Sequence, residues 1–273
     1  MRIKHDAIAG RQSAPAQEAK RPLGEAGRIA IGEKYPLSNG KDGFRSTDYF
    51  VINSRFSSKV TDVYGEKPTE LPILFHSDDY NEVCSEFLEI RDHQGKLYAS
   101  GDGETFSVWN RDRYVQKTIH ERADLMDAIE AYLKKDLPPH KANNIQWIHK
   151  LTIRFIIKKV AILGYWQFTT KGVKTSIPNL RDKFDECIKT FDRISYLPFA
   201  LTVKKVKSNT PGDTRTYPVV DIVPMFGLEA GLQLAQYLRQ HPEANLVQLA
   251  LSDLSKPLTE GSAPLLLNTN NPE

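Results

Sequence analysis

The sequence lacks the features that would place it in a membrane or make it a disulfide-stabilised protein. No apolar run among its 273 residues approaches the roughly 18 needed to cross a bilayer. The polar N-terminus has no apolar stretch of the kind found in a signal peptide. Its two cysteines, Cys84 and Cys187, are too few for an all-thiolate zinc site, and buried reduced thiols are common inside cells. We therefore expect a cytoplasmic protein with two buried thiols.

Motifs that carry known reactions are also missing. The sequence contains no GxSxG elbow, no HExxH and no Walker loop, since neither Gly40-Lys41 nor Gly95-Lys96 has the upstream glycine and the following Ser or Thr. The histidines have no metal-ligand spacing. We therefore predict a protein without catalytic residues, metal or cofactor.

One alternative depends on scattered carboxylates. Asp78 and Asp79 lie side by side, and Asp102 and Glu104 belong to a Gly-Asp-Gly-Glu turn. A metal-dependent nuclease needs several carboxylates that converge on one or two cations. These four residues would have to gather for that alternative to hold.

The distribution of charge is uneven along the chain. Residues 61–100 carry 3 basic and 9 acidic side chains, whereas residues 141–210 carry 14 basic and 4 acidic ones. Such asymmetry points to a polyanion or an acidic protein surface as partner. The acidic region 61–100 and the basic region 141–210 are therefore the candidate surfaces.

Hydrophobic periodicity predicts an α+β fold with a mostly antiparallel sheet and about three helices. The predicted helices cover residues 121–135, 177–193 and 228–239, and Ser176 is the expected cap of the second. The predicted strands cover 49–52, 70–75, 87–90, 96–99, 105–109, 151–162, 164–169, 199–207 and 216–223.

The ends of the chain differ in composition from its middle. Residues 1–27 lack apolar periodicity and are interpreted as a flexible basic arm, and residues 242–273 as a poorly ordered tail. We expect one α+β domain over residues 28–241.

Basic and aromatic side chains alternate in the predicted strands after residue 146. Single-stranded DNA is bound by such mixtures, because cations hold phosphates and rings stack on bases. An ordinary sheet, with its rings inward and its cations in water, gives the same alternation. The candidate binding residues are Lys150, Arg154, Lys158, Lys159, Tyr165, Trp166, Phe168, Lys171 and Lys174.

Several short motifs resemble one phage protein family. They are Gly27-Arg28-Ile29-Ala30-Ile31-Gly32-Glu33-Lys34-Tyr35-Pro36, Gly43-Phe44-Arg45-Ser46-Thr47-Asp48-Tyr49-Phe50, Glu70-Leu71-Pro72-Ile73, Ser100-Gly101-Asp102-Gly103, Gly164-Tyr165-Trp166-Gln167-Phe168-Thr169-Thr170, Pro198-Phe199-Ala200-Leu201 and Tyr217-Pro218-Val219-Val220. Over residues 27–223 the chain is similar to the recombination directionality factor-like proteins of phages that use large serine integrases. Relatives often carry cysteines after the Gly-Asp-Gly turn in the pattern of a metal knuckle, whereas residues 104–150 contain none.

The resemblance implies a non-enzymatic accessory factor of DNA recombination. Such a factor binds a serine integrase on attachment-site DNA and favours excision over integration, which requires differential affinity for two conformations and no active site. It would contact DNA directly or through the integrase. The alternative from the residues alone is a single-stranded DNA-binding protein, which requires Tyr165, Trp166 and Phe168 to be exposed beside a basic groove.

Overall fold

The structure, a computed structural model, describes residues 24–240 except 39, 41, 93, 136, 144, 161, 163, 209, 210 and 213, and only the backbone of His140. The predicted arm and tail lie outside the described residues, apart from residues 24–27. Strand β1 begins at Glu25, inside the predicted arm.

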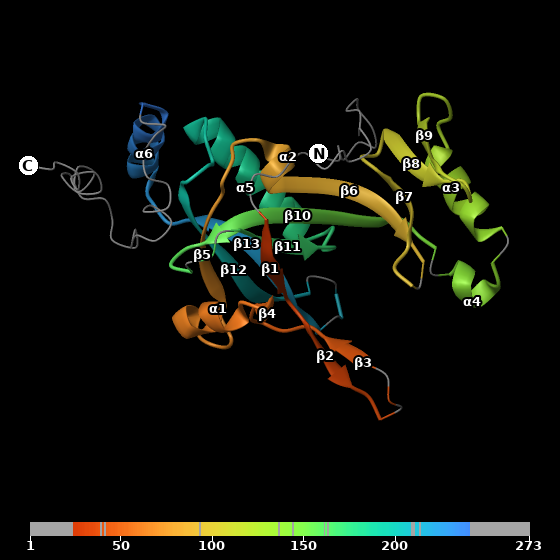
Figure 1. The fold of residues 1–273 in the computed structure, drawn as a ribbon, viewed down its shortest axis with the longest axis horizontal. Coiled ribbons are helices and arrows are strands. Elements are labelled where there is room, and N and C mark those ends of the chain that lie inside the picture. The colour runs from red at the N-terminus through yellow and green to blue at the C-terminus, as the bar shows by residue number, and fades with distance from the viewer. Residues whose placement is uncertain are drawn as a thin grey trace, which may run out of the picture. The chain divides into compact units, whose positions relative to one another are not determined.

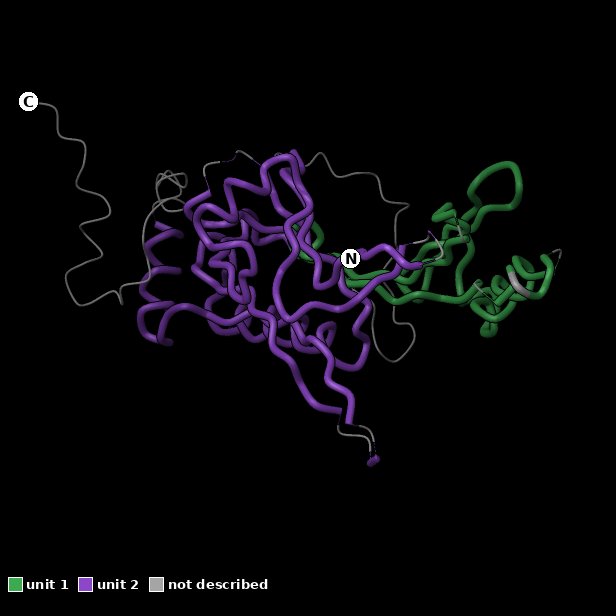
Figure 2. Tube along the Cα trace, turned by 90° about the horizontal axis from the view of Figure 1, so that it is seen from below, with its two compact units in different colours: residues 1–21, 80–153 green, residues 22–79, 154–273 purple. Residues whose placement is uncertain are grey.

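The described chain is α+β, as predicted, and divides into two compact units (Figure 2). Unit 1 contains residues 80–153, and unit 2 contains residues 24–79 and 154–240. Eleven strands belong to one hydrogen-bonded sheet (Figure 1), in which β10 (Ile148–Ile157) runs through the boundary between the units. A single domain over residues 28–241 therefore stays a prediction.

Unit 1 is an antiparallel meander covered by a helix. The strand order is β10-β6-β7-β8-β9, and Leu125 and Ile129 of α3 pack with Phe106 and Ile90 in a shared hydrophobic core. Trp147 lies against Phe106 with ring centroids 5.1 Å apart and donates its indole N–H to the Met126 carbonyl. The elements are α2 (Tyr80–Val83), β6 (Cys84–Arg91), β7 (Leu97–Gly101), β8 (Thr105–Trp109), β9 (Tyr114–Thr118), α3 (Leu125–Lys134) and α4 (Pro139–Ala142).

Unit 2 places strands on both sides of the second half of β10. One branch has the order β13-β12-β5-β10, and in the other β11 pairs with β10 and, in parallel, with β1. The remaining strands are β1 (Glu25–Ala30), β2 (Glu33–Pro36), β3 (Asp42–Arg45), β4 (Val51–Asn53), β5 (Glu70–Leu74), β11 (Tyr165–Thr170), β12 (Pro198–Lys207) and β13 (Thr216–Pro224). The helices are α1 (Ser57–Tyr64), α5 (Ser176–Phe191) and α6 (Leu228–Gln240).

The core of unit 2 forms where α5 meets the sheet. Phe75 lies between Phe184 of α5 and Phe199 of β12, with centroid distances of 4.7 and 5.6 Å. Each ring is almost completely buried. Both cysteines are buried thiols outside any disulfide, as predicted, and burial raises the pKa of the Cys187 thiol to about 11.

Two details of the helices differ from the sequence prediction. Six helices are present among the described residues instead of about three, although α2 and α4 span only four residues each. Ser176 does not cap α5: its hydroxyl accepts the Val220 N–H of β13 at 3.0 Å, which ties the helix to the sheet. No helix in the described part of the chain is long and apolar enough to cross a membrane.

Candidate nucleic-acid and partner interface

The three candidate stacking rings lie in the core of unit 2. Tyr165, Trp166 and Phe168 are 5%, 1% and 0% exposed. Their strand, β11, has β1 on one side and β10 on the other. A Cβ added to Gly27 of β1 would lie 2.7 Å from the Trp166 ring, so this ring packs directly on backbone. Stacking on bases requires exposed rings. The exposure that single-stranded DNA binding needed is therefore absent.

The six candidate cations fall into two groups. Arg154 and Lys158 are buried and have interaction partners, and Lys150 in unit 1 forms an ion pair with Glu89. The other three are exposed in unit 2, and they follow the ends of β10 and β11: Lys159, Lys171 and Lys174. The structure therefore leaves three of the nine predicted residues on a surface that phosphates could reach.

Lys150 belongs to a charge cluster on β6 and β10. Glu89 is 1% exposed and accepts hydrogen bonds from Arg91, Nε to Oε1 at 2.8 Å and Nη2 to Oε2 at 3.1 Å. Burial raises the pKa of Glu89, but the hydrogen bonds from Arg91 and Lys150 together outweigh burial, so the pKa lies below its ordinary value. The charge of Lys150 therefore stabilises a buried carboxylate and is not available to phosphates.

The carboxylates of the nuclease alternative have local structural roles. Asp102 closes the β7–β8 turn, because its Oδ1 accepts the backbone N–H groups of Glu104 at 3.0 Å and Thr105 at 2.9 Å. Glu104 pairs with His120, Oε1 to Nε2 at 2.6 Å. Within the described residues, no three His, Cys, Asp or Glu side chains gather in a way that could hold a metal ion. The convergence that a metal-dependent nuclease needs is not found there.

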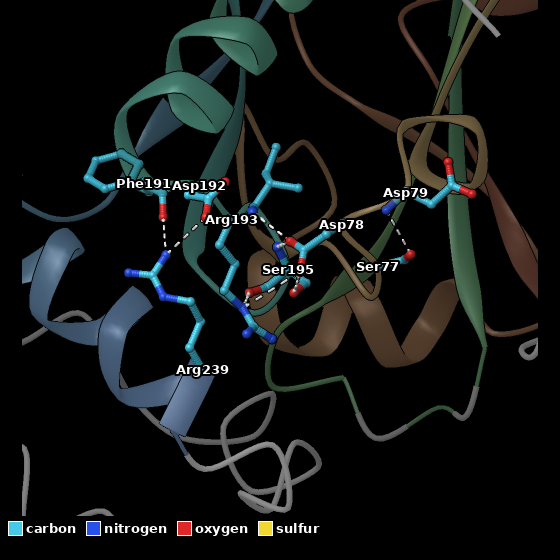
Figure 3. A network of polar contacts seen from close by, with 9 residues as sticks. Ser77, Asp78, Asp79, Phe191, Asp192, Arg193, Ser195 and Arg239 are labelled. Atoms are coloured by element: carbon cyan, nitrogen blue, oxygen red, sulfur yellow. Dashed lines mark hydrogen bonds and ion pairs between the residues drawn. The ribbon is translucent and has the colours of Figure 1, made fainter.

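Asp78 instead holds the loop between α5 and β12 (Figure 3). Its Oδ1 accepts the N–H groups of Ile194 and Ser195 at 2.8 and 2.7 Å, and its Oδ2 accepts the Ser195 hydroxyl at 2.8 Å. Helix α2 begins at Tyr80, directly after Asp79, and is followed at Cys84 by β6. Asp79 donates its N–H to Ser77 Oγ at 3.0 Å (Figure 3).

The β12–β13 hairpin carries a basic surface that the sequence analysis did not single out. Residues 198–203 of β12 are buried, whereas residues 204–207 are exposed. The pairing with β5 ends at Thr202, and from Lys204 onward β12 pairs only with β13. Its exposed cations, here called the basic ribbon, are Lys204, Lys205, Lys207 and Arg215. The sequence signal is the change from Phe-Ala-Leu-Thr-Val to Lys-Lys-Val-Lys within one strand.

Two-stranded ribbons of this kind suit double-stranded DNA. The major groove admits a β-ribbon, and lysines along it reach phosphates. The Lys205 ammonium lies 2.9 Å from the Asp48 carboxylate, and both side chains are exposed. This ion pair partly offsets the positive charge that Lys205 adds to the surface. Lys204 and Lys207 are exposed as well.

Fold and surface together define an α+β protein with a mixed sheet and an exposed basic ribbon. The chain belongs to the recombination directionality factor-like family, also called Gp3-like, which it matches over residues 26–225. This confirms the resemblance found in the motifs between residues 27 and 223. No curated protein and no solved structure matches the chain significantly. The matched region runs from β1 to the end of β13 and includes the basic ribbon.

Proposed function

We propose that this protein binds a serine integrase on attachment-site DNA and favours excision over integration, without catalysing a reaction itself. The observation that carries the proposal is the family match over residues 26–225. The local roles of Asp78, Asp102 and Glu104 support it, because the best carboxylate candidates for catalysis are used to order turns and loops.

A directionality factor works through the difference between two affinities. A ligand that binds both synaptic arrangements equally shifts nothing, and reversing a 99:1 preference takes about 10⁴-fold tighter binding to one of them, or about 5.5 kcal/mol. One protein interface of ordinary size, roughly 800 Å² on each partner, is compatible with such an energy. The protein therefore needs a surface that binds the integrase much more tightly in the excisive arrangement than in the integrative one.

Direct contact with DNA has a secondary part in this proposal. The three ribbon lysines and the exposed Lys159, Lys171 and Lys174 would touch phosphates of DNA already held by the integrase. Such contacts are independent of sequence and weaken as salt rises.

A binding measurement on labelled attachment-site DNA tests the proposal. We expect weak binding by this protein alone, and a stable complex at the same salt concentration once the co-encoded integrase is added. Tight binding of single-stranded DNA by the protein alone would favour the alternative function instead. Failure to join the integrase–DNA complex would contradict the proposal.

A further inference from the structure

The β2–β3 hairpin stands apart from the main sheet. Strands β2 and β3 pair only with each other among the described residues, through Glu33↔Arg45, Lys34↔Phe44, Tyr35↔Gly43 and Pro36↔Asp42. Figures 1 and 2 both show this hairpin extending away from the rest of unit 2. Isolated two-stranded hairpins are marginally stable in water. An exposed hairpin of this kind therefore calls for internal support or a partner.

An aromatic ring lies on each face of the hairpin. Neighbouring pairs in a ladder point to opposite faces, so Phe44 and Tyr35 lie on opposite sides. Each ring covers a glycine: a Cβ on Gly32 would lie 2.1 Å from Phe44 Cζ, and one on Gly43 would lie 2.7 Å from Tyr35 Cζ. Both rings still face solvent, with Phe44 67% and Tyr35 38% exposed. Each face of the hairpin thus presents one aromatic ring to solvent.

The charges of the hairpin are compensated within it. On the Tyr35 face, Arg45 Nε donates to Glu33 Oε1 at 2.7 Å, and on the Phe44 face Lys34 Nζ lies 3.5 Å from Asp42 Oδ2. Each face therefore carries one ring and one ion pair. A surface that binds DNA needs cations whose charge is not neutralised by neighbouring carboxylates. The pairing here instead favours a protein partner over DNA.

We propose that the β2–β3 hairpin inserts between two apolar walls of a groove on the integrase, with Phe44 against one wall and Tyr35 against the other. This inference rests on the proposed function, which supplies the partner. Aromatic side chains are enriched and charged ones depleted at the centres of protein interfaces. A ribbon with a ring on both faces buries both rings only when the partner surrounds it, which excludes a flat docking surface.

Single substitutions on the two faces test the insertion. Phe44→Ala and Tyr35→Ala should each weaken binding of the full-length protein to the integrase at least tenfold, while the melting temperature stays within a few degrees because neither ring belongs to the core. Phe44→Tyr and Tyr35→Phe keep a ring over each glycine and should restore binding. Matched controls are Leu228→Ala on α6 and Tyr132→Ala on α3, whose side chains are 63% and 44% exposed. Both controls should bind the integrase normally.

The outcomes separate this inference from the proposed function. If the unsubstituted protein binds the integrase and both alanine variants bind it equally well, the hairpin is not the docking element, and the proposed function stands. Loss of binding in only one variant would overturn insertion between two walls. If the unsubstituted protein does not bind the integrase, the proposed function fails and the inference with it. A dimer of this chain that Phe44→Ala converts to monomers, with integrase binding unchanged, would show that a second copy covers the hairpin.

Discussion

At the scale of single residues, Asp78 orders a loop whose backbone is otherwise unfavourable. Asp192 and Tyr196 have φ of 51° and 59°, a left-handed conformation that non-glycine residues adopt infrequently. Between them, Asp78 accepts the N–H groups of Ile194 and Ser195 (Figure 3). Arg239 of α6 closes the other end of the loop by donating to the Phe191 carbonyl at 3.1 Å (Figure 3).

Removal of this carboxylate should therefore destabilise unit 2. We expect Asp78→Ala to lower the free energy of unfolding by about 1–2 kcal/mol, because two N–H groups of buried residues lose a charged acceptor while the half-exposed site lets water replace part of it. Urea denaturation measures this difference. The exposed Asp62 serves as control, and Asp62→Ala should change stability by less than about 0.5 kcal/mol. Equal effects of the two variants would show that the loop does not depend on Asp78.

Glu89 makes stability depend on pH. The pKa of Glu89 is lowered in the folded protein. The ionised carboxylate therefore stabilises the fold at pH values above the pKa of a glutamate in the unfolded chain, about 4.3. This stabilisation is lost as the pH falls through the pKa of Glu89 in the folded protein. We expect Glu89→Gln to lower the free energy of unfolding by about 1–3 kcal/mol at neutral pH. The difference from the unsubstituted protein should shrink on acidification below about pH 4.

Denaturation curves at several pH values check this dependence. The exposed Glu121 provides the control, since Glu121→Gln should change stability by less than about 0.5 kcal/mol. A Glu89→Gln effect that stays constant down to low pH would contradict the lowered pKa.

At the scale of elements, β11 lies between β1 and β10 in the sheet, and its aromatic residues belong to the core. Trp166 is buried against β1 and 1% exposed. We expect Trp166→Ala to lower the free energy of unfolding by about 3–5 kcal/mol, as large-to-small changes in cores do. Val173→Ala, at a side chain that is 45% exposed beyond β11, should change it by less than about 0.5 kcal/mol. Thermal unfolding measures both differences. If Trp166→Ala had the same melting temperature as Val173→Ala, the Trp166 ring would not belong to the core.

The sequence predicted most elements of the sheet because local patterns determine them. The predicted strands 87–90 and 96–99 correspond to the pair β6–β7, and the predicted strands 199–207 and 216–223 correspond to the pair β12–β13. Residues 125–134 form a helix within the predicted range because their apolar side chains recur at helical spacing. Helix α1 was missed because Val60 is its one fully buried side chain, which leaves little periodicity to detect.

The candidate site was harder to predict because burial depends on distant partners. Tyr165 and Trp166 are adjacent and point to opposite faces of β11, yet both are buried. Their neighbours come from remote parts of the chain: the His76 ring stacks with Tyr165 at 6.4 Å between centroids, and Gly27 lies against the Trp166 ring. The two-residue period of a strand shows which side chains share a face of the sheet, but it does not show which face other elements bury. The exposed ends of β12 could have been inferred only from the point where its apolar residues stop.

At the scale of the whole molecule, charge on the basic ribbon should set the salt dependence of the integrase complex. We expect the triple variant Lys204→Ala, Lys205→Ala, Lys207→Ala to reduce the slope of log affinity against log salt for the integrase–DNA complex by up to about 0.9 for each phosphate that the ribbon no longer neutralises. Affinity for integrase without DNA should not change. The matched control replaces three exposed lysines that are not part of the ribbon: Lys59, Lys96 and Lys117. A slope that the control lowers as much as the triple variant does would mean that the ribbon has no special role in binding DNA.

The direction of recombination tests the central claim most directly. Purified integrase would be incubated with excisive and with integrative DNA substrates, with and without this protein, and the products of each reaction would be measured. We expect the protein to stimulate excision and suppress integration, with no recombination when the integrase is omitted. Unchanged yields of both reactions in the presence of saturating protein would contradict the account.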